Sequence, residues 1–181
     1  MNIHFTVILT TLWGYAACTV TNSTFSREKT DEEKCTKITL PDTCTCSIET
    51  DEENTYHHFK ATCLNGNLTE VPESLPNVTI IRVQFNQITV LETVHQWTVQ
   101  DLTLSNNGIR LIKDGAFKKL QQLKTLRLSY NEITGLHSGT FIGLSNLGQL
   151  NLDNNRIYEL EDFIFSGSTM PKLRHLNLRN S

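Results

Sequence analysis

Several features that would mark a common protein class are missing from this sequence of 181 residues. The formal net charge is only −3, and no run of Lys and Arg exceeds two residues, which argues against a nucleic-acid or membrane-surface partner held by charge alone. The apolar stretch from Phe5 to Leu12 is too short to span a bilayer, and no longer one follows. No glycine-rich phosphate loop and no GxSxG elbow occurs. We therefore expect neither an enzyme nor a bound cofactor.

The N-terminus lacks charged side chains. From Ile3 to Cys18 there is no Asp, Glu, Lys or Arg, and the stretch ends in the small residues Ala-Ala-Cys. This pattern predicts a secretory signal peptide over residues 1–18, followed by a flexible segment over 19–34. A buried N-terminal strand is one alternative, because the leader lacks the usual Lys or Arg near its start. A bacterial lipoprotein leader is the other, because Tyr15-Ala16-Ala17-Cys18 resembles its cleavage box. We expect a secreted, extracellular chain.

Four cysteines follow the predicted leader, at positions 35, 44, 46 and 63. An even number in an exported chain favours two disulfides, but the sequence leaves three pairings open. Zinc is the alternative, because His57 and His58 lie nearby, although no CxxC spacing supports it and we expect no metal. Glycosylation sequons begin at Asn22, Asn67 and Asn77, which agrees with a secretory route.

An internal repeat predicts the fold. When the chain is aligned to itself at a shift of 24 residues, columns of identical or similar residues appear. The columns contain Leu102, Leu126 and Leu150; Leu104, Leu128 and Leu152; Asn107, Asn131 and Asn155; Ile109, Ile133 and Ile157; Ile112, Leu136 and Leu160; and Phe117, Phe141 and Phe165. Helical repeats would space their apolar residues by three and four, whereas here they are two apart.

The frame continues in both directions with changed lengths. Upstream it includes Val83 and Asn86, and downstream it includes Leu176 and Leu178. Each unit reads LxxLxLxxNxIxxL, then about five residues, then Phe. Over residues 78–181 the chain resembles the leucine-rich-repeat family. That resemblance implies an α/β solenoid, a right-handed horseshoe with a parallel β-sheet on its concave side.

Physical chemistry accounts for the repeated residues. Leucines two apart on a strand point the same way, into the coil, whereas Thr125, Arg127 and Ser129 would face solvent. Stacked asparagines can satisfy the backbone of the following turn, which predicts a structural ladder through Asn86, Asn107, Asn131 and Asn155. The phenylalanines would close the convex side beneath short helical or irregular segments such as 114–123. Each coil needs its neighbours to bury its apolar edges.

The cysteine-rich segment 35–76 resembles the N-terminal cap of extracellular leucine-rich-repeat proteins. The Cys44–Cys46 pair and the LTEVP–LP segment carry this likeness, which implies the disulfides Cys35–Cys46 and Cys44–Cys63. The gaps between the cysteines are wider than is usual for the family. An acidic insert, 49–54, together with His57 and His58, occupies the second gap, and we expect a longer exposed loop there.

The chain ends inside a repeat. Residues 77–181 hold about four and a half repeats, and Ser181 takes the ladder position, with no closing Phe and no C-terminal cap after it. We expect the last coil to expose an apolar edge through which the protein self-associates. We also expect the sequence to be a fragment or shortened form of a longer chain.

The concave face is the expected binding surface. Exposed aromatic residues and arginines dominate the binding energy at interfaces. The expected ligand-binding residues are Arg82, Phe85, Arg127, Tyr130, Asp153 and His175. The width of the sheet suits a protein ligand, which could carry glycans. The likeness to Toll-like receptors and to adhesion or guidance ectodomains implies a receptor-like or adhesion module. A secreted matrix protein similar to the small leucine-rich proteoglycans, or a free immune factor or decoy, is the alternative.

Overall fold

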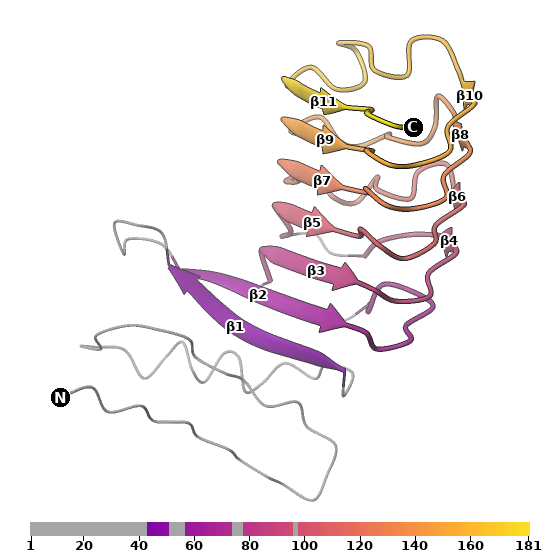
Figure 1. Cartoon of the computed structure of the whole chain (residues 1–181). Coiled ribbons are helices and arrows are strands. Elements are labelled where there is room, and N and C mark those ends of the chain that lie inside the picture. The colour runs from indigo at the N-terminus through magenta and orange to yellow at the C-terminus, as the bar shows by residue number, and fades with distance from the viewer. Residues whose placement is uncertain (1–42, 51–56, 74–77, 96–97) are drawn as a thin grey trace, which may run out of the picture.

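The computed structural model describes residues 43–50, 57–73, 78–95 and 98–181, and its described part is built of strands and turns without a helix. Seven strands form one sheet in the order β1 (Cys44–Thr50), β2 (His57–Leu64), β3 (Ile80–Gln84), β5 (Asp101–Thr103), β7 (Thr125–Arg127), β9 (Gln149–Asn151) and β11 (His175–Asn177). Figure 1 shows the coils from β3 to β11 stacked one above another. The short strands β4 (Val90–Leu91), β6 (Leu111–Ile112), β8 (Gly135–Leu136) and β10 (Glu159–Leu160) lie on the opposite side. The predicted solenoid with a parallel sheet is thus confirmed, but in the described residues it is a β-solenoid, without the helices of the expected α/β class. The predicted leader and the segment 19–34 lie outside the described residues.

The parallel part of the sheet contains one strand from each repeat. These strands are β3 (Ile80–Gln84), β5 (Asp101–Thr103), β7 (Thr125–Arg127), β9 (Gln149–Asn151) and β11 (His175–Asn177). Leu102 pairs with Leu126, and Leu126 with Leu150, so each repeat column lies in register across the sheet. A shift of 24 residues in the sequence is therefore one step from strand to strand.

An antiparallel hairpin begins the sheet. β1 (Cys44–Thr50) pairs with β2 (His57–Leu64), and β2 continues parallel to β3. Cys44 and Cys63 face each other in this register and form a disulfide, while Cys46 is disulfide-bonded as well. The implied Cys44–Cys63 bond is thus present. Cys35, the expected partner of Cys46, lies outside the described residues.

Part of the segment that was expected to form an exposed loop between Cys46 and Cys63 is strand, while residues 51–56 lie outside the described residues. Glu49 pairs with His58 and Thr50 with His57, so both histidines belong to a strand. An ion pair between Lys60 and Glu49 compensates part of the acidic charge of the insert across the hairpin. Backbone pairing satisfies the donors and acceptors of these residues, which a free loop would leave to water. Because the Cys44 sulfur is bonded to Cys63, it is not available as a zinc ligand.

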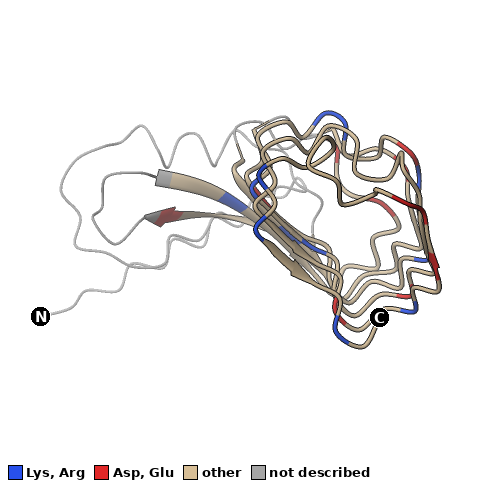
Figure 2. Cartoon of the chain, turned by 90° about the horizontal axis from the view of Figure 1, so that it is seen from above, with Lys and Arg blue, Asp and Glu red and all other residues tan. Residues whose placement is uncertain are grey.

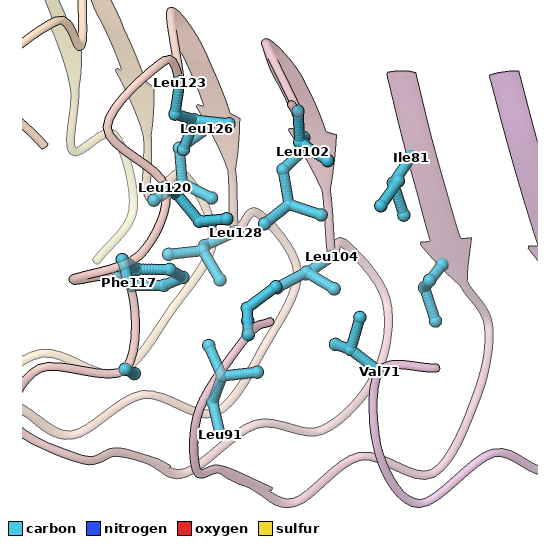
Figure 3. Close-up of a cluster of buried hydrophobic side chains, with 14 of the residues drawn as sticks. Val71, Ile81, Leu91, Leu102, Leu104, Phe117, Leu120, Leu123, Leu126 and Leu128 are labelled. Carbon is cyan, nitrogen blue, oxygen red and sulfur yellow. The ribbon is translucent and has the colours of Figure 1, made fainter. Parts of the chain in front are cut away.

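The core fills the inside of the coils. Leu102, Leu104, Leu126 and Leu128 have no exposed surface and point from the sheet toward the convex side, where Phe117 and Leu120 meet them (Figure 3). Burying one such leucine contributes about 1.5–3 kcal/mol. The alternation of buried and outward residues in β3 and β7 follows from the two-residue period of a strand.

Turns and short strands, instead of helices, form the convex side. β4 (Val90–Leu91) pairs with β6 (Leu111–Ile112), and β8 (Gly135–Leu136) pairs with β10 (Glu159–Leu160). Residues 114–123 form successive turns, so the irregular alternative applies there. Bonds from Ala116 N to Lys113 O and from Leu120 N to Phe117 O are of the i→i+3 kind. A segment this short gains little from a helix, because nucleation is costly.

Stacked phenylalanines close the convex side. The ring centroids of Phe117 and Phe141 are 6.2 Å apart, and those of Phe141 and Phe165 are 6.1 Å apart. Phe117 and Phe141 are fully buried, whereas Phe165 is half-buried. The column of phenylalanines that was expected to close the convex side is therefore present as a stack of rings.

Buried asparagines connect each coil to the next. The Asn131 side-chain nitrogen donates to Leu104 O at 3.0 Å and Leu128 O at 2.8 Å. Its side-chain oxygen accepts from three backbone N–H groups of the preceding coil, those of Asn107, Gly108 and Ile109. Similar bonds join Asn86, Asn107 and Asn155 to their neighbouring coils. In the last described coil, the Ser181 hydroxyl donates to Leu152 O at 2.7 Å in the same manner.

Candidate ligand-binding face

The outward residues of the parallel strands form columns across the concave face. One column contains Lys60, Ile80, Asp101, Thr125, Gln149 and His175, and the next contains Thr62, Arg82, Thr103, Arg127, Asn151 and Asn177. Parallel strands lie about 4.8 Å apart, so each column runs straight across the sheet. These side chains are not needed to fill the core and are available for a ligand. Seen from above, the coils superpose, and charged residues are spaced around their outline (Figure 2).

Not every outward residue faces solvent as the sequence suggested. Thr103, Ser105 and Ser129 are buried. The hydroxyls of Ser105 and Ser129 bond to each other at 2.9 Å. Strands about 4.8 Å apart let longer neighbouring side chains cover small ones. These short residues therefore form the floor of the face, and only the longer side chains project from it.

The strand ends carry a conformational signature that the sequence reasoning missed. One residue per coil, directly before the ladder position, has a left-handed backbone. The positions are Asn65, Phe85, Asn106, Tyr130, Asn154 and Asn180, with φ between 53° and 59°. Asparagine tolerates this conformation, whereas an aromatic residue is strained there by about 1–2 kcal/mol. The recurrence of Asn at these positions is the signal that could have predicted the turn.

Phe85 and Tyr130 are thus exposed aromatic residues at strained positions. Their exposed fractions are 54% and 58%. Neither side chain fills the core, so packing does not compensate for the backbone strain. Strain that persists without a packing reason points to a functional constraint. This supports both residues as candidate contacts, and Tyr130 more strongly because it lines a groove.

The structure divides the expected binding residues between two grooves. A concave groove of about 590 Å³ crosses β7, β9 and β11 and is lined by Arg127 and His175. A strand-end groove of about 540 Å³ runs along the turns and is lined by Tyr130. Arg82, Phe85 and Asp153 line neither.

An ion pair holds Arg127 in place on the concave face. Its Nη1 lies 2.8 Å from Oδ1 and 2.9 Å from Oδ2 of Asp101, on the preceding strand. The pair is partly exposed, so its contribution to stability is small, on the order of 0–1 kcal/mol. Its main effect is geometric, because it fixes one nitrogen of the guanidinium and leaves the remaining donors facing the groove.

The strand-end groove contains a second charge cluster. Glu132 accepts a bond from Arg110 Nε at 2.8 Å and lies 3.7 Å from Arg156 Nη2. The bond from Arg110 lowers the pKa of the Glu132 carboxyl below its ordinary value, and the charges of Arg110 and Arg156 lower it further. Glu132 is therefore ionised and balanced beside Tyr130.

Asp153 lies in the same column as Arg179, one coil earlier. Its Oδ2 accepts a bond from the Asn154 side chain at 2.6 Å, while its buried Oδ1 has no hydrogen-bond partner among the described residues. Of the sequons, Asn67 is exposed and its side-chain oxygen accepts from Gln87 at 3.1 Å. Asn22 and Asn77 lie outside the described residues. Within the described ranges, no His, Cys, Asp and Glu residues group as a metal site.

Comparison with known proteins agrees with the repeat. Residues 98–157 match the leucine rich repeat family model. Leucine-rich repeat-containing protein 3B of Homo sapiens is 40% identical over 75 residues, and the Mus musculus and Bos taurus proteins match equally well. Each alignment covers 38% of this chain and 28% of the relative. The chain thus spans little more than a quarter of these relatives.

A solved structure shares the fold. The chain superposes on part of the structure titled "Crystal structure of TLR13-ssRNA13 complex" with a TM-score of 0.58 and 29% sequence identity. The match covers 66% of this chain and 17% of that one. The resemblance to leucine-rich-repeat proteins, and to a Toll-like receptor among them, is thereby confirmed. In the described part of the chain, no helix is long and apolar enough to cross a membrane.

Proposed function

We propose that this chain is an extracellular recognition module that binds a protein ligand through the concave sheet and the strand-end turns. The observation that carries the proposal is the placement of an exposed aromatic residue, Tyr130, on a strained backbone in the same coil as an anchored arginine, Arg127. Tyrosine and arginine are the residue types that most often dominate interface energies. Leucine-rich repeats are typically binding modules, and we propose that this one catalyses nothing.

The proposal includes the organisation of the chain. Residues 1–18 act as a secretory signal peptide, 35–76 as an N-terminal cap, and 77–181 as the recognition surface. The Cys44–Cys63 disulfide supports an oxidising compartment, because disulfides persist outside the cytosol. We propose a receptor-like or adhesion protein as the natural context. A free secreted matrix or immune factor is the second candidate, and the same face would serve it.

The low net charge does not exclude a nucleic-acid partner. The solved neighbour is a complex with ssRNA, so this fold is compatible with such a ligand. We favour a protein because both grooves are lined with residues of mixed type, and only the concave one collects several arginines. Single-stranded RNA belongs in the binding test beside the proteins.

The test is a binding screen with matched variants. The full secreted chain is presented to a panel of purified cell-surface and secreted proteins and to single-stranded RNA. Arg127→Ala with Tyr130→Ala should weaken binding of a protein from the panel about tenfold or more. The control removes one cation and one aromatic ring away from both grooves, as Lys118→Ala with Tyr158→Ala, both of which are exposed.

The control variant should bind as the unaltered chain does. If both variants bind alike, recognition does not use this face and the proposal is wrong. If only RNA binds, and binding is lost in the first variant, the ligand class is wrong while the face is right. Melting temperatures of both variants exclude an unfolding artefact.

A further inference from the structure

The concave groove differs from the rest of the face in the hydrogen-bonding groups that it offers. Its lining residues include Arg127, Asn151, Arg174, His175, Asn177 and Arg179. Three of them are arginines and none is acidic, although the chain as a whole carries a net charge of −3. A ligand that enters this groove therefore meets a locally positive surface.

Two amides in the groove present only their donor groups. The Asn151 side-chain oxygen accepts the backbone N–H of Asp153 at 2.9 Å, and that of Asn177 accepts the backbone N–H of Arg179 at 3.1 Å. A backbone N–H can only donate, so the amide orientation follows from the bond itself. The two Nδ2 groups have no partner among the described residues. Both asparagines line the groove, where these N–H groups can donate to a ligand.

Two of the arginines are not compensated by a carboxylate. Asp101 neutralises Arg127, but in the described part of the chain no ion pair reaches Arg174 or Arg179. In the repeat frame the acid nearest to Arg179 is Asp153, in the same column one coil earlier, and no ion pair forms between them. His175 lies between these two arginines in sequence and also lines the groove. The end of the groove at β11 thus has unmatched positive charge.

From these contacts we infer that the concave groove takes an acidic segment of the protein ligand, with Asp or Glu side chains seated on Arg174, Arg179 and the amides of Asn151 and Asn177. A guanidinium binds a carboxylate through two parallel hydrogen bonds, and an amide N–H adds a further donor. The inference rests on the proposed function and specifies the chemistry of its partner.

An acidic peptide fits the groove better than a polyanion. Binding of nucleic acid gains with each phosphate neutralised, and two unmatched arginines neutralise few. Single strands also stack their bases on aromatic side chains, and His175 is the sole ring among the lining residues. A short peptide segment with two or so carboxylates matches Arg174 and Arg179, the two arginines of the groove that no described carboxylate neutralises.

The test uses a displayed library of random peptides, selected on the full disulfide-bonded chain. Enriched peptides should carry an excess of Asp and Glu. Their affinity should fall about tenfold in the variant Arg174→Gln with Arg179→Gln, and it should weaken as salt rises. No described bond involves these side chains, so the variant should melt as the unaltered chain does. The matched control, Lys113→Gln with Lys118→Gln, removes the same charge after β6 and should leave affinity unchanged.

Three results would overturn the inference. The first is enrichment without acidic bias, and the second is equal affinity in both variants. The third is binding of heparin or polyuridylate that is lost in the Arg174/Arg179 variant while no acidic peptide binds. None of these results contradicts the proposed function, which fails only if no ligand depends on Arg127 and Tyr130. The two failures are therefore distinguishable.

Discussion

The side-chain oxygen of Asn131 lies 3.1 Å from the backbone nitrogen of Asn107 and accepts its hydrogen, so one coil completes the turn of the coil before it. The same oxygen serves Gly108 and Ile109. Replacing Asn131 with Leu leaves these buried donors without a partner, and we expect a loss of about 3–5 kcal/mol in the free energy of unfolding in urea. Asn131→Ser should lose less, because Ser181 shows that a hydroxyl can reach the carbonyl of the preceding coil. Equal losses would contradict the ladder's role.

Relief of backbone strain should stabilise the chain at two positions. Tyr130→Asn and Phe85→Asn each place at a left-handed position the residue type that the other coils use there. We expect the free energy of unfolding to rise by about 1 kcal/mol in each. If Tyr130 is also a ligand contact, its variant should gain stability and lose affinity together. A fall in stability would mean that the aromatic rings pack more than their exposure indicates.

A close approach of two coils requires glycine at position 143. A Cβ there would lie 2.5 Å from the backbone of Lys118, and φ is +95°. Gly143→Ala should therefore destabilise the chain by more than 1 kcal/mol. Gly167→Ala is the control, because open space surrounds that position, and its effect should be within about 0.5 kcal/mol. Similar melting temperatures for the two variants would be inconsistent with this packing.

The pKa of Glu132 gives a prediction for acid conditions. Because Arg110 and then Arg156 lower this pKa in the folded state, the carboxylate stabilises the fold above the unfolded pKa and loses that effect as the pH falls through the folded value. Titration of the side-chain carboxyl by NMR should give a midpoint below that of an ordinary glutamate. Arg110→Gln should move the midpoint upward. An unchanged midpoint would show that the Arg110 contact is not maintained in solution.

The Cys44–Cys63 disulfide should stabilise mainly the first strands. Replacing both cysteines with Ala removes a cross-link between residues 19 apart, and we expect a loss of about 3 kcal/mol. Hydrogen exchange should rise most in β1 and β2, while β7 and β9 stay protected by their ladder bonds. Uniform exchange along the whole chain would instead mean that the solenoid unfolds as one unit from its N-terminal end.

The sequence predicted how the coils stack, but it did not predict the side-chain contacts on their outward face. The leucine columns predicted the strand register correctly, because a period of 24 residues leaves one way to align Leu102, Leu126 and Leu150. The bond between Arg127 and Asp101 was not foreseen, since the two residues lie in different columns and only side-chain reach brings them together. Nor could periodicity reveal that Ser105 and Ser129 bond to each other and lie buried on the outward face.

The sequence also did not predict the structure of the convex side or the backbone strain at the strand ends. The sequence left short helical and irregular segments as alternatives, and the turns at 114–123 follow from local i→i+3 bonds. Tyr130 was singled out for its ring, whereas its left-handed backbone depends on the turn into the ladder asparagine. Tyr130 and Arg127 line different grooves, and this difference depends on where the coil bends between them.

Chemical-shift mapping tests the central claim, that the concave sheet is the recognition face, most directly. The ¹⁵N-labelled chain is titrated with the protein partner found in the binding screen. The largest shifts should fall on the side-chain N–H groups of Arg127, Asn151 and Asn177 and on the strand-end turn at Tyr130. Shifts gathered instead on the convex turns between Lys113 and Leu123 would contradict the account.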